Sequence, residues 1–204
     1  GGELNAPKER TSASGLRTQA CYRRREPKFV GVSGGLRWIV RLRSLPTKRS
    51  LPHGVTRMQP VYTLTISLID SRPQIWRRVL VSGNVRLKKL HQIIQAVMPW
   101  TESHLHQFIF PDTLYSDPAF YTDEDCDWGD IRDESKALLR KVAVHDGCVF
   151  AYRYDFGDDW RHLIHVDLIA ENDSSYPGHP VCIEGQNACP PEDCGGIEMY
   201  YLDF

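Results

Sequence analysis

The feature of this sequence that most constrains its fold is a pair of alternating apolar runs, residues 148–155 and 160–170, joined by Phe156-Gly157-Asp158-Asp159. A period of two is typical of strands that bury one face. A glycine in a short connection adopts positive φ at little cost, as tight turns between antiparallel strands often require. The runs therefore predict a β-hairpin with Gly157 at positive φ.

The side chains of this hairpin predict a hydrophobic core. Each strand presents one apolar row: Phe150, Tyr152, Tyr154 and Phe156 on the first, and Trp160, His162, Ile164, Val166 and Leu168 on the second. Burying such rows against a helix contributes about 25 cal/mol per Å² of apolar area. A platform for stacking bases is the less favoured interpretation, because the one basic residue on the first strand, Arg153, lies on its opposite face.

Other segments complete an α+β pattern. Residues 61–68 and 75–81 alternate around Asp70-Ser71-Arg72-Pro73 and predict a second hairpin, and residues 87–98 have the apolar spacing of an amphipathic helix. The remaining segments are predicted as a strand at 104–110, a long acidic loop at 112–133, a helix or strand at 134–143, an irregular stretch at 171–196 and a final helix from 197.

The charge distribution divides the chain. Residues 1–57 carry 13 Lys/Arg and 3 Asp/Glu, whereas residues 58–204 carry 12 and 23, a net charge of −11. The basic part has too few apolar residues to build a core, so it is predicted to be a disordered extension, with Met58 as the natural start. A nucleic-acid-binding arm is the functional alternative for this extension.

The six cysteines and the hydropathy predict a cytoplasmic protein. Cysteines at 21, 126, 148, 182, 189 and 194 do not form the dense set of a small secreted scaffold, and we interpret them as reduced thiols. No run approaches the roughly 18 apolar residues needed to span a bilayer, so no membrane partner is expected.

Four stretches, in order along the chain, resemble one known family. They are Ile75-Trp76-Arg77-Arg78-Val79; Leu90-His91 through Trp100 to His104-Leu105-His106; Tyr154-Asp155-Phe156-Gly157-Asp158-Asp159-Trp160 with His162; and Cys189-Pro190-Pro191-Glu192-Asp193-Cys194-Gly195-Gly196. Together they are similar to the plasmid pRiA4b ORF-3-like family, over residues 61–200.

The resemblance implies a single α+β domain with a curved, mixed or mainly antiparallel sheet and a packed helix. It also implies a prokaryotic protein encoded on a plasmid or mobile element, and it implies no established reaction. Some relatives carry a resolvase-like label, but this chain lacks the nucleophilic-serine context of a serine recombinase. Relatives usually continue beyond the double glycine, so the C-terminus at Phe204 is expected to be truncated.

Acidic residues mark the expected binding surface. It comprises Asp155, Gly157, Asp158, Asp159, Trp160, His162, Glu192 and Asp193. Crowded carboxylates repel unless a cation or an arginine neutralises them, as in hydrolytic metal sites. A buried structural ion pair of Asp155 with Arg77 or Arg78 is an alternative. Ordinary turns use the same aspartates, through bonds to backbone amides.

Two sets of side chains could bind a metal. Cys182, Cys189 and Cys194, with His179, offer four zinc ligands at irregular spacing, and buried free thiols are the alternative. His104 and His106 would project from one strand face as a second possible pair of ligands.

These observations favour the hypothesis that the chain is a binding or accessory module, which recognises a protein partner through the acidic surface. The first alternative is a metal-dependent hydrolase acting on phosphoesters, with Asp158, Asp159, His162 and Glu192 holding the ion. The second is a DNA-associated protein aided by the basic extension, which the charge of −11 on the domain opposes. Motifs for nucleotide binding and for a serine-hydrolase elbow are absent from the sequence.

Overall fold

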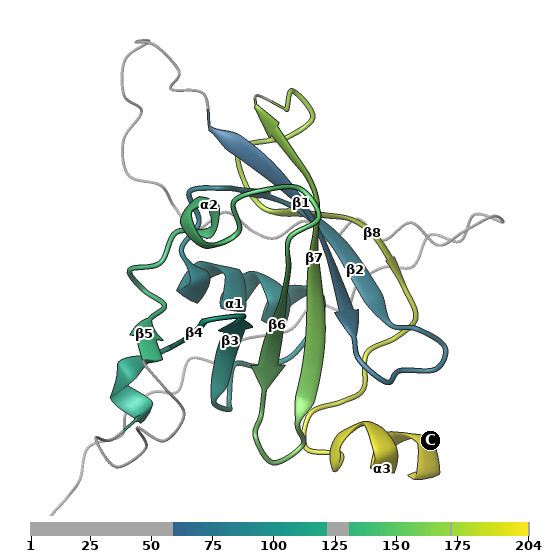
Figure 1. Ribbon diagram of the computed structural model, residues 1–204. Coiled ribbons are helices and arrows are strands. Elements are labelled where there is room, and N and C mark those ends of the chain that lie inside the picture. Colours follow the sequence, from purple (N-terminus) through teal and green to yellow (C-terminus); the bar gives the residue numbers. More distant parts are fainter. Residues whose placement is uncertain (1–58, 122–130, 172, 204) are drawn as a thin grey trace, which may run out of the picture. The chain divides into compact units, whose positions relative to one another are not determined.

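The computed structural model describes residues 59–121, 131–171 and 173–203 (Figure 1). The expectations about residues 1–57 lie outside this part of the chain. The described elements, in chain order, are β1 (Pro60–Leu68), β2 (Trp76–Ser82), α1 (Leu87–Val97), β3 (His106–Phe110), β4 (Thr113–Ser116), η1 (Pro118–Phe120), β5 (Ile131–Asp133), α2 (Leu139–Val142), β6 (Val149–Tyr154), β7 (Trp160–Glu171), β8 (Val181–Gln186) and α3 (Gly196–Asp203).

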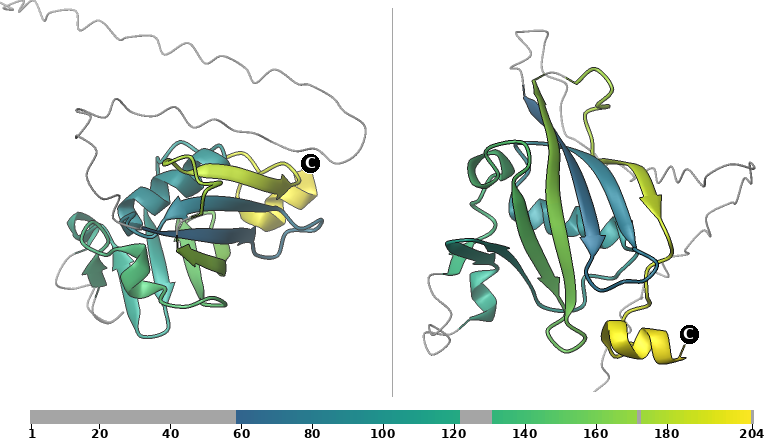
Figure 2. Two further views of the ribbon diagram at one scale, coloured as in Figure 1. Left: turned by 90° about the horizontal axis from the view of Figure 1, so that it is seen from above. Right: turned by 45° about the vertical axis from the view of Figure 1, so that its right-hand side comes forward.

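Within these residues the strands form one eight-stranded sheet in the order β5-β4-β3-β6-β7-β1-β2-β8. The β4–β5 pair is parallel, and the other neighbouring strands are antiparallel. Helix α1 crosses one face of the sheet, as both further views confirm (Figure 2). The predicted single α+β domain with a mixed sheet and a packed amphipathic helix is therefore confirmed. None of the described helices is both long enough and apolar enough to cross a membrane.

The core lies between α1 and the centre of the sheet. Helix α1 contributes fully buried Leu87, Leu90 and Ile94. The central strands contribute most of the predicted rows, with Phe150, Tyr152, Tyr154, Trp160, His162, Ile164 and Val166 all buried. Phe156, predicted at the end of the first row, lies in the turn after β6 and is only partly buried. The hairpin of β6 and β7 pairs Tyr154 with Trp160, so the two rows meet on the face that α1 covers.

Leu168 departs from its predicted row. In the pairing of β1 with β7, Leu64 lies opposite Val166 but Thr63 lies opposite Leu168, so Asp167 is an extra residue on β7. Such a bulge reverses the alternation beyond it. Leu168 consequently faces outward and is 50% exposed.

The prediction of positive φ at Gly157 is wrong. Positive φ occurs on either side of it, at Asp155 (54°) and Asp159 (54°). Aspartate tolerates this region because its side chain bonds to nearby backbone amides. Here Asp155 Oδ1 accepts hydrogen bonds from the backbone N–H groups of Gly157 (3.0 Å) and Asp158 (3.4 Å).

Two segments are more regular than the sequence predicted. The stretch expected to be a long acidic loop contains β4, η1 and β5, and the stretch expected to be irregular contains β8. Within 134–143, predicted as a helix or a strand, the short helix α2 forms. Strand β8 is an edge strand held by β2, with Trp76 opposite Gln186. Its regularity comes from a partner that is distant in sequence, which its own composition does not reveal.

A polar layer lies buried beneath α1. The rings of His91 and His106 stack with centroids 3.5 Å apart, and His106 Nε2 lies 2.8 Å from Glu134 Oε2. His91 Nδ1 is 2.7 Å from the hydroxyl oxygen of Tyr152, which also accepts a hydrogen bond from Gln95 Nε2 (3.1 Å). Burial, helped by His106 and Lys88, lowers the pKa of His91 to about 3, so this imidazole is neutral at pH 7.

Candidate functional site

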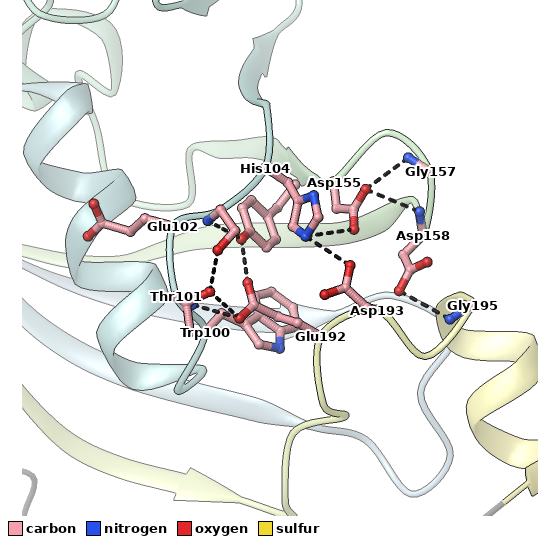
Figure 3. Close-up of polar contacts among 12 residues, drawn as sticks. Trp100, Thr101, Glu102, His104, Asp155, Gly157, Asp158, Glu192, Asp193 and Gly195 are labelled. Atoms are coloured by element: carbon pink, nitrogen blue, oxygen red, sulfur yellow. Dashed lines mark hydrogen bonds and ion pairs between the residues drawn. The ribbon is translucent and has the colours of Figure 1, made fainter. Parts of the chain in front are cut away.

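Three segments that are far apart in the sequence meet at one end of the sheet. They are the connection between α1 and β3 (residues 100–105), the turn between β6 and β7 (155–159) and the segment leading into α3 (189–196) (Figure 3). Each coincides with one of the four stretches that carry the family resemblance. The remaining stretch, Ile75-Trp76-Arg77-Arg78-Val79, lies mainly on β2. There Arg77 Nε donates a hydrogen bond to the carbonyl oxygen of Val97 (3.1 Å), which ties the end of α1 to the sheet.

Glu192 joins the first segment to the hairpin. Its Oε2 accepts hydrogen bonds from the backbone N–H of Thr101 (2.9 Å) and from Thr101 Oγ1 (2.6 Å), and its Oε1 accepts one from the hydroxyl of Tyr154. Burial, the largest single influence, raises the pKa of Glu192, but the hydrogen bonds from Thr101 and Tyr154 together outweigh it and lower the pKa overall. The carboxylate therefore acts as a charged structural bridge.

We expect Glu192→Gln to lower the free energy of unfolding by about 1–2 kcal/mol, because the amide replaces charge-assisted hydrogen bonds with neutral ones and turns a donor toward Thr101 or Tyr154. Chemical denaturation measures this change. Glu184→Gln is the matched control, because Glu184 is 53% exposed and pairs with Arg78 at the surface, a contact worth at most about 1 kcal/mol. Equal effects of the two variants would show that Glu192 is not a bridge.

Trp100 supports the proline-containing segment. Its indole Nε1 donates a hydrogen bond to the carbonyl oxygen of Pro190 (3.0 Å), and its ring stacks on Tyr154 with centroids 5.3 Å apart. The same indole lies edge-on to His162, with centroids 5.3 Å apart. Through Trp100, the 189–196 segment is therefore held against Tyr154 of β6.

The double glycine allows the α3 segment to touch the hairpin turn. Gly195 and Gly196 have φ values of 84° and 80°. A Cβ atom on Gly196 would lie 2.5 Å from the carbonyl oxygen of Asp158, and the Gly195 N–H donates to Asp158 Oδ2 (3.2 Å). Glycine at position 196 is therefore required by both backbone conformation and close approach.

One histidine and two aspartates converge where the segments meet. His104 Nε2 lies 3.0 Å from Asp193 Oδ1 and 3.6 Å from Asp155 Oδ2. Among the described residues, these three side chains are the one group of three or more His, Cys, Asp or Glu whose ligand atoms all lie within 4.8 Å of one another. Their arrangement has the donor set of a small divalent cation site.

The alternative ion pair of Asp155 with Arg77 or Arg78 does not form. Arg77 Nη1 donates to the carbonyl oxygens of Trp76 (2.8 Å) and Gln186 (3.0 Å), whereas Arg78 contacts the carboxylates of Asp167 (3.1 Å) and Glu184 (2.6 Å). Alternation on β2 directs Arg78 to the sheet face away from α1. The guanidinium of Arg77 is occupied by carbonyl oxygens of β2, β8 and the end of α1. Asp155 faces His104 instead.

The other residues predicted for the acidic surface separate into different roles. Asp159 pairs with Arg153 and with Arg161 (3.5 Å). Trp160 and His162 are buried in the core and are not part of a surface. The set Asp158, Asp159, His162 and Glu192, expected for a phosphoesterase, does not form a common group of possible metal ligands in the described chain.

Burial lowers the pKa of His162 to about 4, and the adjacent backbone of Tyr152 and Trp160 opposes this shift only in part. Neither ring nitrogen of His162 has a partner with hydrogen-bond geometry among the described residues. His162 is therefore a neutral core residue at pH 7.

The cysteines and His179 are not brought together as a zinc site among the described residues. Cys182 Sγ donates to the carbonyl oxygen of Glu184 (3.4 Å), and Cys189 Sγ lies 3.2 Å from Met98 Sδ. Burial raises the pKa of Cys189 to about 12 and also raises the pKa of Cys194.

The predicted pair of ligands His104 and His106 is also separated. Strand β3 begins at His106, which points into the core, while His104 in the preceding loop joins the surface group.

A pocket of about 390 Å³ opens beside the histidine–aspartate group. It is lined by Glu102, Ser103, His104, Leu105, Phe120, Asp155, Phe156 and Gly157. Phe120 and Leu105 line it with large exposed apolar side chains, 54% and 38% exposed. Sequence reasoning missed Glu102, Leu105 and Phe120 as site residues. Leu105 lies within a motif stretch, but nothing in the pattern around Phe120 points to this site.

Comparisons with known proteins place the chain among uncharacterised relatives. Residues 60–202 match the family described as plasmid pRiA4b ORF-3-like protein. The chain is 35% identical over 142 residues to uncharacterized protein y4hQ of Sinorhizobium fredii (strain NBRC 101917 / NGR234), an alignment covering 67% of each protein. The crystal structure of a protein of unknown function, MM3350 from Methanosarcina mazei Go1, is similar with a TM-score of 0.62 and 31% identity, covering 71% of this chain and 80% of that one.

Proposed function

The chain belongs to the plasmid pRiA4b ORF-3-like family, and from that premise we propose that its domain is a binding module that recognises a basic segment of a partner protein. The observation that carries the proposal is a pocket lined by two motif stretches, residues 102–105 and 155–157. It lies beside the point where the third stretch, through Asp193, meets His104 (Figure 3).

The charge around the pocket supports a cationic partner. Asp155, Asp158, Glu192 and Asp193 form no ion pair with lysine or arginine among the described residues, and Glu102 adds a further carboxylate to the pocket wall. Complementary charge steers association and selects against partners of the wrong sign. Phe120 and Leu105 add exposed apolar contact area to the same opening, so the pocket fits a Lys or Arg side chain flanked by an apolar one.

Binding is also favoured over thiol catalysis. Burial raises the pKa of the four described cysteines, Cys148, Cys182, Cys189 and Cys194. A nucleophilic cysteine needs the opposite shift, because the thiolate is the reactive form. DNA is the less favoured ligand, because the net charge of −11 on residues 58–204 repels phosphates.

The proposal extends to the origin of the gene and to the compartment in which the protein acts. The family description names a plasmid reading frame, which supports an origin on a plasmid or another mobile element in a prokaryote. The four described cysteines are free, which supports a reducing compartment, the cytoplasm.

We expect a labelled peptide of alternating Lys/Arg and Leu/Phe to bind the chain more tightly than the same peptide with glutamate in place of its basic residues. Fluorescence anisotropy measures both affinities. Because the pocket supplies an apolar and an acidic contact, Phe120→Ala and Glu102→Gln should each weaken binding of the basic peptide by about fivefold, equivalent to roughly 1 kcal/mol.

The matched control is Val144→Ala, which removes an exposed apolar side chain (65% exposed) outside the pocket and should leave peptide affinity unchanged. The proposal fails if Phe120→Ala and Val144→Ala behave alike, or if the glutamate peptide binds equally well. A labelled DNA duplex belongs in the same assay: binding of DNA that is tighter than that of the basic peptide and insensitive to both pocket variants would favour the DNA-associated alternative.

A further inference from the structure

We propose that His104, Asp155 and Asp193 bind a divalent transition-metal ion through one imidazole nitrogen and two carboxylate oxygens. The proposal concerns the chain alone and does not depend on the peptide partner proposed above. It replaces the metal sites expected from the sequence, because the cysteine set and the Asp158–Glu192 set do not converge among the described residues, and His104 and His106 contact different carboxylates.

The separations of the three ligand atoms match a coordination sphere. Metal–oxygen and metal–nitrogen bonds of about 2.0–2.2 Å place neighbouring ligand atoms roughly 3.0–3.5 Å apart in octahedral or tetrahedral geometry. His104 Nε2 lies 3.0 Å from Asp193 Oδ1 and 3.6 Å from Asp155 Oδ2. The two carboxylate oxygens also lie within 4.8 Å of each other, so an ion placed among the three atoms is within reach of each after side-chain adjustment.

The environment of His104 independently favours a bound cation. Its Nε2 is shielded from solvent, yet it has no partner with hydrogen-bond geometry among the described residues, although Asp193 Oδ1 is only 3.0 Å away. A buried polar atom without a hydrogen bond is destabilising, because it has lost its bonds to water. Its lone pair would be satisfied by a cation placed between the imidazole and the two carboxylates.

Asp155 is held in position for this role. Its Oδ1 accepts the N–H groups of Gly157 and Asp158, which fixes the carboxylate plane and leaves Oδ2 facing His104. The side chain is only 10% exposed and forms no ion pair with a lysine or arginine among the described residues. Burial of a carboxylate is less costly beside a cation, and a metal ion here would supply the compensating positive charge.

The ligand chemistry selects the class of ion. Carboxylate oxygen with imidazole nitrogen suits Mn²⁺, Fe²⁺ or Zn²⁺, whereas thiolate-rich sites select softer ions. Asp193 is 73% exposed, so the site is open on the side of this carboxylate, where water or a group from a partner can complete the coordination sphere.

The experiment uses Mn²⁺ with the full chain, because Mn²⁺ avoids the free thiols that would bind zinc elsewhere. Protein treated with chelator and then dialysed is titrated with MnCl₂, and the loss of the solvated Mn²⁺ signal in electron paramagnetic resonance gives the bound fraction. We expect one Mn²⁺ per chain, with affinity lowered at least about tenfold by Asp193→Asn and by His104→Gln.

Asp159→Asn is the matched control, because it removes the same charge from the same turn but belongs to the pair with Arg153 and Arg161. It should change Mn²⁺ affinity by less than about threefold, as expected for long-range attraction alone. Asp193 is exposed, so Asp193→Asn should keep the melting temperature of the metal-free protein, and an unchanged melt shows that lost binding is not unfolding.

Absence of stoichiometric Mn²⁺ binding, or an equal effect of Asp159→Asn and Asp193→Asn, would overturn the metal site. The two proposals fail separately. Loss of peptide binding in Phe120→Ala with Mn²⁺ binding retained would support both, whereas Mn²⁺ binding without any peptide preference would leave the metal site standing alone.

Discussion

Replacing Gly196 with alanine is expected to lower the free energy of unfolding by about 3 kcal/mol, through strain at a positive φ combined with a steric clash. The φ of Gly196 is 80°, and a Cβ atom there would lie 2.5 Å from the carbonyl oxygen of Asp158. The neighbouring atom is backbone, so it cannot rotate away. Relief requires the start of α3 to move off the hairpin turn, which would also separate Gly195 from Asp158.

Gly178→Ala separates the two causes. Gly178 has a similar φ of 83°, but nothing lies within 4 Å of a Cβ atom placed there. Its replacement should cost about 1 kcal/mol from backbone conformation alone. Denaturant unfolding of both variants gives the difference, which measures the contact between Gly196 and Asp158. Similar losses in the two variants would mean that the segment before α3 does not press on the turn.

Acidification from pH 7.5 to pH 5 is expected to remove about 4 kcal/mol of stability, because two buried histidines must stay neutral in the folded protein. Burial lowers the pKa of His91 to about 3 and that of His162 to about 4. Above the ordinary histidine pKa of about 6.5, both states are neutral and nothing is lost. Below about pH 6.5 these two histidines take up protons in the unfolded chain but stay neutral in the folded protein. The free energy of unfolding therefore falls by roughly 2.7 kcal/mol per pH unit.

His162→Leu tests this assignment. Because neither nitrogen of His162 has a hydrogen-bond partner among the described residues, leucine of similar volume should be neutral or stabilising at pH 7.5. The slope between pH 6 and pH 5 should fall to about 1.4 kcal/mol per unit, the contribution of His91 alone. Urea unfolding at several pH values measures the slope. An unchanged slope in His162→Leu would show that this imidazole does not control acid stability.

Sequence reasoning succeeded where a pattern is local. The hairpin of β6 and β7, the strand β1 and the amphipathic helix α1 each carry their periodicity within one segment, so their faces could be assigned. It failed where geometry comes from a distant partner. Leu168 faces outward because β7 has an extra residue opposite β1, and β8 is a strand because β2 provides its hydrogen bonds.

At the candidate site, too, local motifs could be recognised from the sequence, but contacts between distant segments could not. Asp155 and Asp193 could be named from their motifs, but their common neighbour His104 was expected to act with His106. That pairing assumed a strand through residue 104, whereas β3 begins two residues later. Phe120 could not have been found, because no local pattern signals that η1 lies beside the hairpin turn.

The convergence of His104, Asp155 and Asp193 has a consequence for chain topology. A ligand bonded to all three is a cross-link that closes two successive loops, one from the α1–β3 connection to the hairpin and one from the hairpin to the residues before α3. A ligand that binds only the folded state shifts the folding equilibrium toward that state by mass action. Occupancy of the proposed site would therefore be linked thermodynamically to the attachment of the segment before α3, because that segment supplies Asp193.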